Sequence, residues 1–320
     1  MNTENSTIAN EVNEILENHG LDFSIKKLKM VAILPLDETE TKTLIEHMEG
    51  ATERMIPTDY FGLYNTKNTK VINAVKDSYH VSQNFDILNM VFQGISKFTD
   101  KVEVSKAGSI NEGRRVFIQL RIKGKAKVGN DTLEQYITII DSNDGSTSLS
   151  VGIGDEVARC TNQFWKFYKV GQSRFRHTAS IEQRIAELPE LIEIALDNAF
   201  QQLEVYNRFK NTVVDRELVH TFVNKVYGID RVCSSIEERA NQKTKGLNIM
   251  NEIYNDIDTE INQVGTNLWA LFGGITRFTT HHQTAPKRDN GRFESQTSGQ
   301  AYKLNQKAFD FCLEYLNKAA

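Results

Sequence analysis

Hydrophobic and polar positions change their period between residues 84 and 184, and this segment is the centre of the chain. Its first part predicts an amphipathic helix, because four apolar residues recur at helical spacing: Phe85, Leu88, Phe92 and Ile95. Over residues 114–123 the pattern switches to strict alternation between apolar residues and residues that are mostly basic or polar. That alternation predicts a half-buried strand with a basic outer face.

Three further strands are predicted around this one, at about 101–109, 133–141 and 146–153. The segments between the strands read Asn-Glu-Gly, Gly-Asn-Asp and Asn-Asp-Gly, which are typical of tight turns. Strands that follow one another along the chain favour an antiparallel meander. The central segment is therefore predicted to be a helix, a four-stranded meander and a helix.

The flanking segments predict mainly helices. Before the centre we expect a helix at 6–19, a strand at 30–36, a helix at 41–48 and a loop at 51–69. After it we expect a long helix from residue 181 with a kink at Pro189, and helices at 213–226, 232–262 and 301–317. The polar stretch 279–300 is typical of a long mobile loop.

These elements predict an α+β fold with a central antiparallel β-meander flanked by helices and a mainly helical C-terminal part. Three regions are expected. They are an acidic N-terminal α/β region at 1–80, a helix–meander–helix core at 81–212, and a helical C-terminal region at 213–320.

Composition indicates a folded protein, because 320 residues with 39% hydrophobic content suffice for a sizeable core. No window approaches the roughly 18 consecutive apolar residues of a membrane helix, and the acidic N-terminal segment lacks the pattern of a signal peptide. Cys160, Cys233 and Cys312 are far apart and odd in number, which argues against a disulfide framework or a zinc ribbon. We expect a cytoplasmic protein without a membrane contact.

The net charge of −4 conceals a segregation of charge along the chain. Residues 97–127 hold 9 basic and 3 acidic side chains, whereas residues 128–158 hold 6 acidic and no basic ones. Residues 159–184 are basic again, with 6 basic and 1 acidic side chain. Two basic blocks in one unit favour a groove for a polyanion on an otherwise acidic particle.

The cations of these blocks are the candidate DNA-binding residues. The first block offers cations whose shared parity predicts that they line one face of the strand: Arg115, Arg121, Lys123, Lys125 and Lys127. The second block, which also contains Trp165 and Phe167, offers phosphate contacts and a ring for base stacking: Lys166, Tyr168, Lys169, Arg174 and Arg176. The alternative interpretation is a solvated basic strand and a helix whose aromatic residues belong to the core.

Catalytic and metal-binding motifs are weak. His281 and His282 are adjacent, so they lack the i, i+4 spacing that would aim both rings at one ion. Gly152-x-Gly154 lacks the third glycine of a dinucleotide loop, and the Asp residues at 141 and 144 are typical of a tight turn. We therefore expect no catalytic residue, no metal and no cofactor.

A set of short motifs occurs in a fixed order along the chain. They are Tyr-His-Val-Ser-Gln-Asn at 79–84, a Gly-rich hairpin at 107–114, Asp-Ser-Asn-Asp-Gly-Ser at 141–146, Cys-Thr-Asn at 160–162, Arg-His-Thr at 176–178, and Gly-Thr-Asn-Leu-Trp at 265–269 with Thr276, Phe278 and His282 beyond. The set resembles phage/plasmid-like proteins of the domain of unknown function 932 family, over most of residues 20–310. Gln163 and the position of Arg159 depart from the family pattern, which leaves the role of Arg159 open. The resemblance implies a bacteriophage or mobile-element protein in a bacterial host cell, and no activity.

The predicted order of helix, meander and a following basic helix also resembles the core of the single-strand annealing proteins, the group of Rad fifty-two, Red beta and RecT. That resemblance implies an oligomeric ring or filament that binds single-stranded DNA in a basic groove, with a phage nuclease as an expected partner. We therefore expect a protein that binds and anneals single-stranded DNA in recombination or replication. The alternatives are a non-DNA interaction protein, such as a phage regulator or a host-defence antagonist, and a hydrolase with an unrecognised site.

Overall fold

The computed structural model describes residues 2–35, 53–96, 100–167, 174–175, 177, 181–228 and 245–319. The helices are α1 (Asn2–Asn18), α3 (Asn84–Ile95), α4 (Ile181–Ile185), α5 (Leu188–Asn211), α6 (Arg216–Tyr227), α8 (Lys245–Val264), α9 (Leu268–Arg277), the π-helix η3 (Phe278–His282), α10 (Gly291–Thr297) and α11 (Gln300–Ala319). The strands are β1 (Ile25–Pro35), β2 (Glu53–Asn65), β3 (Lys70–Lys76), β4 (Val102–Ile110), β5 (Arg115–Ile122), β6 (Ala126–Val128), β7 (Asp131–Ser142), β8 (Leu149–Val157), β9 (Gln163–Lys166) and β10 (Arg174–Phe175).

The predicted meander forms the centre of the molecule. Within the described residues a seven-stranded antiparallel sheet has the order β10-β8-β7-β5-β4, with β6 paired to β7 and β9 paired to β8. A separate three-stranded sheet has the order β1-β2-β3. Both the α+β class and the helical C-terminal part are confirmed.

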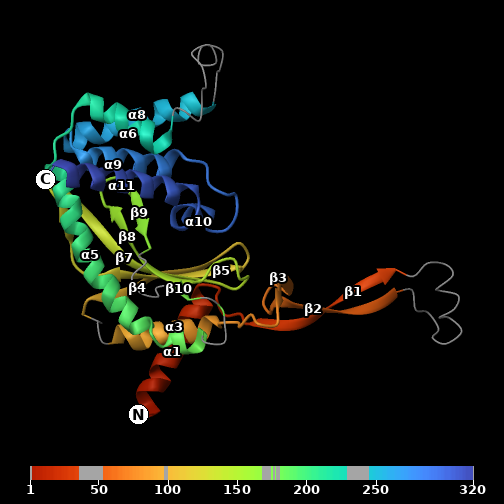
Figure 1. Ribbon diagram of the computed structural model, residues 1–320. Coiled ribbons are helices and arrows are strands. Elements are labelled where there is room, and N and C mark those ends of the chain that lie inside the picture. Colours follow the sequence, from red (N-terminus) through yellow and green to blue (C-terminus); the bar gives the residue numbers. More distant parts are fainter. Residues whose placement is uncertain are drawn as a thin grey trace, which may run out of the picture.

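Helices cover the sheet on two sides (Figure 1). The helices α1 and α3 lie below the sheet, and α6, α8, α9 and α11 lie above it. The helix α5 runs along one side and spans both layers. The β1–β2 ribbon projects from the opposite side of the molecule.

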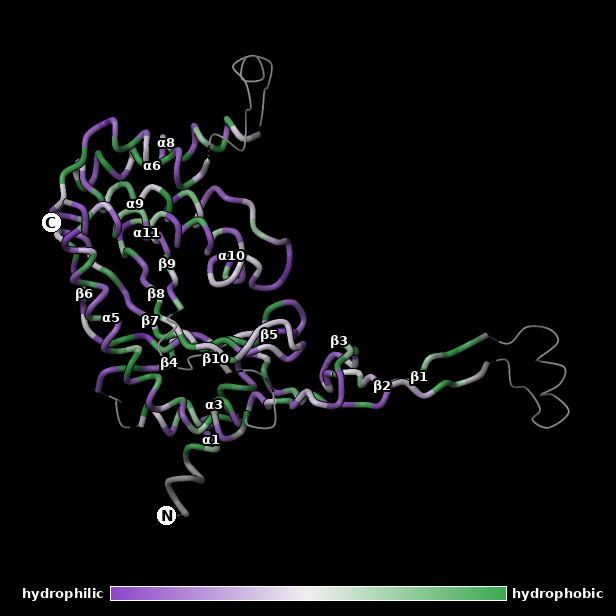
Figure 2. The backbone as a smooth tube through the Cα atoms, viewed as in Figure 1, coloured by the Kyte–Doolittle hydropathy of each residue, from purple (hydrophilic) through white to green (hydrophobic). Residues whose placement is uncertain are grey.

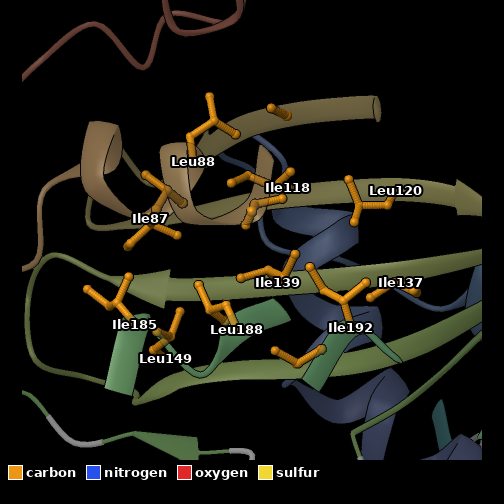
Figure 3. Close-up of a cluster of buried hydrophobic side chains, with 14 of the residues drawn as sticks. Ile87, Leu88, Ile118, Leu120, Ile137, Ile139, Leu149, Ile185, Leu188 and Ile192 are labelled. Atoms are coloured by element: carbon orange, nitrogen blue, oxygen red, sulfur yellow. The ribbon is translucent and has the colours of Figure 1, made fainter. Parts of the chain in front are cut away.

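The core below the sheet is built from the apolar residues that alternate along the strands. Figure 3 shows side chains from β5, β7, α3 and α5 meeting in this core, among them Ile118, Leu120, Ile137, Ile139, Ile87, Leu88, Leu188 and Ile192. All of these residues are at most 4% exposed. Burying such a side chain contributes about 1.5–3 kcal/mol, so the alternation fixes which face of β5 points down.

A second core lies above the sheet and joins the C-terminal helices to its upper end. Phe164 on β9 packs against Phe272 of α9 and Phe309 of α11, with ring centroids 4.9 and 5.4 Å apart. Tyr206 and Phe209, in the second half of α5, belong to the same core. The first half of α5 lies in the lower core, so this helix ties the two cores together.

The buried carboxylate of Asp155 lies where α5 passes from the lower core to the upper core. The carboxylate of Asp155 on β8 accepts hydrogen bonds from Gln135 at 2.8 Å, from Gln202 at 2.6 Å and from the hydroxyl of Tyr206 at 2.8 Å. Burial raises the pKa of Asp155, and the three hydrogen bonds oppose that shift. These bonds hold α5 at a fixed position along the sheet.

The predicted basic outer face of the 114–123 strand is wrong in its middle part. Phe117 is fully buried and Gln119 is 6% exposed, although both share the parity of Arg115 and Arg121. Phe117 packs against Phe293 of α10, with ring centroids 4.2 Å apart. An element almost 180 residues further along the chain thus covers the face that local alternation assigns to solvent.

The predicted loop at 51–69 is also wrong, because most of it forms β2. Pro57 pairs with Val31 directly beside the register shift between Lys29 and Val31, and proline is tolerated in a strand at such an irregularity. Strand β3 follows after a turn at 66–69. The predicted strand at 30–36 is confirmed as the longer strand β1.

The predicted long loop at 279–300 is wrong as well. Residues 278–282 are a π-helix, residues 291–297 are α10, and Thr279, Gln296 and Thr297 are buried. Trp165, expected on a helix, lies on strand β9. The expected kink at Pro189 is a break between α4 and α5, with the proline in the first turn of α5.

The predicted helices at 6–19, 85–95, 213–226 and 301–317 are confirmed as α1, α3, α6 and α11, and the second half of 232–262 is α8. The predicted helix at 41–48 and residues 232–244 lie outside the described residues. None of the described helices has the combination of length and hydrophobicity needed to cross a bilayer.

We predict that Gly154→Ala destabilises the fold by at least about 2 kcal/mol in urea unfolding. A Cβ at this position would lie 1.8 Å from the ring of Trp165, which sits over the glycine in the β8–β9 pair. Gly62→Ala in β2 is the matched control, because its Cβ would meet the side chains of Val71, at 3.1 Å, and Met30, at 3.6 Å, without overlapping either. We expect that control to change stability by less than about 1 kcal/mol. Equal losses would contradict the packing argument.

Candidate functional site

The β4–β5 hairpin and the β7–β8 turn meet at one end of the sheet, beside α10. The strand register places Ile110 opposite Arg115, and Arg115 opposite Ser142. A groove of about 880 Å³ opens there between the sheet and the segment from 284 to 303. This volume lies in the range of ordinary ligand sites.

The chemistry of the groove is that of an anion site with apolar walls. Its described lining residues include three cations, Arg115, Arg288 and Lys303, and one carboxylate, Glu294. Hydroxyl groups come from Ser146, Thr147, Ser150, Thr284, Thr297 and Ser298, and Tyr302 adds another. The rings of Phe167 and Tyr302 form part of the wall, with centroids 6.0 Å apart.

Glu294 fixes the two arginines of the groove. Arg115 Nη1 donates to Glu294 Oε1 at 3.2 Å, and Arg288 donates from Nε to Oε2 and from Nη2 to Oε1, both at 2.8 Å. Arg115 also donates to Ser146 Oγ at 3.0 Å and to Ser298 Oγ at 3.2 Å. A guanidinium has five N–H donors, so these bonds orient the two arginines without exhausting them.

The other candidate cations of the first block lie away from the groove. Arg121 forms an ion pair with Glu103 on β4, with Nε 2.9 Å from Oε1. It lies six residues along β5 from Arg115, which corresponds to roughly 20 Å. Lys123 and Lys125 are exposed in the bend after β5, and Lys127 is exposed on β6.

The predicted parity holds for the three cations that lie on paired strands, Arg115, Arg121 and Lys127. Arg121 lies opposite Tyr136 and Lys127 lies opposite Thr132 on β7, so both side chains point to the same face of the sheet as Arg115. The structure nevertheless divides them into two groups, because the buried Phe117 and Gln119 lie between. Arg115 belongs to the groove, and Lys123, Lys125 and Lys127 form a separate basic patch.

Of the second block, Lys166 is placed between the sheet and α11. Its Nζ lies 4.1 Å from the ring centroid of Phe309, and burial lowers the pKa of this lysine. The backbone of Arg174 belongs to β10, which pairs with β8. Tyr168, Lys169 and Arg176 lie outside the described residues.

Three of the sequence motifs converge in a buried cluster next to the groove. Ser82 Oγ donates to Asp141 Oδ2 at 2.6 Å, and His177 Nε2 lies 3.0 Å from Asp141 Oδ1. The His177 ring stacks on Tyr79, and its Nδ1 lies 3.2 Å from the carbonyl oxygen of His80. The motifs at 79–84, 141–146 and 176–178 are thereby held together.

The geometry of this cluster differs from that of a hydrolase triad. Both nitrogens of His177 face acceptors, the carbonyl oxygen of His80 and the carboxylate of Asp141, which suits a doubly protonated ring. Ser82 Oγ also lies 3.3 Å from Nδ1 of His177, but its shorter hydrogen bond, at 2.6 Å, is donated to Asp141 Oδ2, whereas a catalytic serine gives its proton to a neutral imidazole nitrogen. Ser82, Asp141 and His177 are each at most 7% exposed, and their contacts hold three distant chain segments together.

A second cluster joins the motifs at 160–162 and 265–269. Arg159 Nε donates to Asp131 Oδ1 and Arg159 Nη2 donates to Glu260 Oε2, both at 2.6 Å. Asn162 donates to Glu260 at 3.0 Å, and Trp269 Nε1 donates to Asp131 at 2.8 Å. Arg159, whose role the sequence left open, therefore joins the end of the sheet to α8.

The two adjacent histidines have separate contacts. His281 Nε2 lies 2.9 Å from the carbonyl oxygen of Cys160, and His282 Nδ1 lies 2.8 Å from Asp256 Oδ2. Within the described ranges, no group of three or more His, Cys, Asp or Glu side chains is arranged to hold a metal ion.

We predict that the ion pair of His177 and Asp141 makes stability depend on pH. Burial lowers the pKa of His177, but the hydrogen bond and charge of Asp141 outweigh it, so the pKa is raised above 6.5. A raised pKa in the folded state gives stability that is complete below about pH 6.5 and is lost as pH rises through the folded pKa. Asp141→Asn should therefore lower the free energy of unfolding more at pH 6 than at pH 9.

The measurement is urea unfolding at both pH values, with the exposed His220 replaced by Gln as the control. The control should keep the pH dependence of the wild type. A loss that is equal at both pH values would exclude a charged His177.

Comparisons with known proteins give one match. Neither the curated proteins nor the solved structures contain a match to this chain. A family model described as a domain of unknown function (DUF932) matches residues 71–308, which include the groove and both motif clusters. The motifs that carried the resemblance are thus part of a match over most of the chain, and the protein belongs to the DUF932 family.

Proposed function

We propose that this protein binds and anneals single-stranded DNA as an oligomer, in the recombination or replication of a bacteriophage or mobile element. The observation that carries the proposal is the groove, in which Arg115, Arg288 and Lys303 gather beside two aromatic rings. Cations contact phosphates, and flat rings stack with bases of any sequence. Both features contribute to binding that does not depend on sequence.

Charge in the groove suits an anion such as a phosphate better than an apolar ligand. Glu294 neutralises one of the three cations and fixes the two guanidiniums, so a net positive charge remains at a preorganised position. Serine and threonine hydroxyls around it can donate to phosphate oxygens. Tyr302 and Phe167 provide a surface for one or two bases.

The basic patch of Lys123, Lys125 and Lys127 serves as a second contact for the DNA backbone in this proposal. Its Lys127, on β6, lies on the same face of the sheet as Arg115, and Lys123 and Lys125 lie in the bend between β5 and β6. Annealing requires no catalytic residue, because neutralised and extended strands pair spontaneously once their bases are presented together. A nuclease encoded by the same element would supply the single strands.

A second candidate function is that of an interaction protein without DNA. It is favoured by the β1–β2 ribbon, which exposes Ile33 and Met55 to solvent at 56% and 67%. Large exposed apolar side chains on a projecting element are typical of contact surfaces. Such a surface is compatible with the leading proposal, in which copies of the chain associate.

We predict sequence-independent binding of single-stranded DNA that weakens steeply with salt. If about five cations contact phosphates, the slope of log K against log salt concentration is roughly −3 to −4. Fluorescence anisotropy with labelled oligonucleotides of two unrelated sequences, over a salt series, measures the slope. Binding that is indifferent to salt, or absent, would overturn the proposal in favour of the interaction protein.

We predict that Arg288→Ala with Lys303→Ala reduces the affinity for single-stranded DNA at least tenfold, because both cations lie in the groove. Replacing Lys123, Lys125 and Lys127 together by Ala should weaken binding less. Both variants should lower the magnitude of the salt slope, since each removes phosphate contacts.

Lys318→Ala with Lys307→Ala is the control, because these lysines are exposed on α11 and do not line the groove. Unfolding in urea must be unchanged for all three variants. If the groove variant binds like the control, the groove is not the DNA site.

A further inference from the structure

The β1–β2 ribbon, which we call the arm, is an unusual surface for a single folded chain. It exposes large apolar side chains on both of its faces. Ile33 lies opposite Met55 on one face, and Leu34 and Ile56 belong to the other. Figure 2 shows these apolar stretches along the projecting part of the arm. A ribbon that is apolar on both faces needs a partner surface.

The arm is also basic. Strand β1 carries Lys26, Lys27 and Lys29 and no acidic residue, whereas β2 carries Arg54, Glu53 and Asp59, so four basic against two acidic residues leave the arm a net charge of +2. Lys27 pairs with Asp77, whereas Lys26 and Lys29 are exposed, as is Lys76 on β3 at the base of the arm. The surface of the arm therefore combines apolar side chains with positive charge, and the complementary surface is apolar and acidic.

The outer face of α5 has that complementary character. Its exposed side chains include four carboxylates, one cation and two large apolar groups, and these are Glu190, Glu193, Asp197, Glu204, Arg208, Ile194 and Phe200. Phe200 is 57% exposed. The opposite face of α5 is buried in both cores, so the helix is a rigid support for a partner.

The dimensions and positions of the two surfaces also match. Strand β1 has 11 residues and α5 has 24, so each is about 36 Å long at 3.3 and 1.5 Å per residue. In Figure 1 the arm leaves one side of the molecule and α5 runs along the opposite side. The arm of one molecule therefore cannot fold back onto its own α5 without leaving its base.

We propose that the arm of one copy docks on the outer face of α5 of a second copy. The contact is head to tail, because each bound copy still offers one arm and one α5 to further copies. Repetition gives a closed ring or an open filament. This inference deepens the proposed function by naming the surfaces through which its oligomer forms, but association itself needs no DNA.

The test is a charge exchange between the two surfaces, with the molar mass measured by light scattering at micromolar protein without DNA. Lys26→Glu with Lys29→Glu reverses the charge at two positions of the arm. Glu193→Lys with Asp197→Lys reverses the charge at two positions of α5. The wild type should form oligomers, and each variant alone should associate at least tenfold more weakly. An equimolar mixture of the two variants should recover oligomers, since each reversed surface then meets its opposite.

Two controls separate this contact from general effects of charge. Glu217→Lys with Glu314→Lys makes the same charge change on exposed positions of α6 and α11 and should associate like the wild type. Ile33→Ser with Met55→Ser should weaken association without recovery in any mixture, because it removes apolar contact rather than charge.

Three outcomes would overturn the inference. They are a monomeric wild type, undiminished association of the reversed variants, and a mixture that fails to recover oligomers. A monomer that sediments with anionic lipid vesicles would assign the arm to a membrane surface instead.

Binding of a short oligonucleotide, measured in parallel, separates the two proposals. A wild type that associates but does not bind the oligonucleotide refutes only the proposed DNA binding. Monomeric variants that still bind the oligonucleotide leave the proposed DNA site unaffected.

Discussion

Burial of the central strands on both faces is the constraint on which the rest of the structure depends. Most residues of β5, β7 and β8 are buried, including polar ones such as Gln119 and Thr138. A sheet of this kind needs a helical layer on each side, since exposing either face would cost about 1.5–3 kcal/mol for each large apolar side chain. The two layers of helices, and the helix α5 that belongs to both, follow from this requirement.

The same constraint explains the polar clusters, because polar groups that enter a doubly covered sheet must be paired. Asp155 is held by three donors where α5 crosses the sheet. Asp141 is held by Ser82 and His177 at one end, and Asp131 by Arg159 and Trp269 at the other. Most of the family motifs therefore serve to fix the contacts between distant segments.

The groove and the arm differ from the rest of the molecule in their charged and apolar side chains, which packing within the chain does not fully bury or neutralise. In the groove, Glu294 orients Arg115 and Arg288 but leaves an excess of positive charge beside aromatic walls. In the arm, apolar side chains remain in solvent although the body of the molecule has buried most others. We propose the groove as a site for a polyanion and the arm as a surface for another copy of the chain. If copies associate through the arm and α5, every copy brings its own groove into a repeating array.

The sequence by itself determined the meander and the helices whose periodicity is long and clean. Alternation over 114–123 with glycine-containing turns on both sides determined the order and pairing of β4, β5, β7 and β8, and the motifs identified the family.

Local patterns could not show which polar positions a distant element covers. Phe117 and Gln119 look like solvent positions until α10 packs on them, and residues 279–300 look like a loop until Arg288 and Glu294 bond across it. Arg115 was a candidate by its charge and its strand parity. Its partner Glu294 lies 179 residues away, so only the tertiary structure decided that Arg115 belongs to a groove. The reason is physical: a local period records which side of one element is apolar, whereas burial and ion pairing depend on contacts between elements that are far apart in sequence.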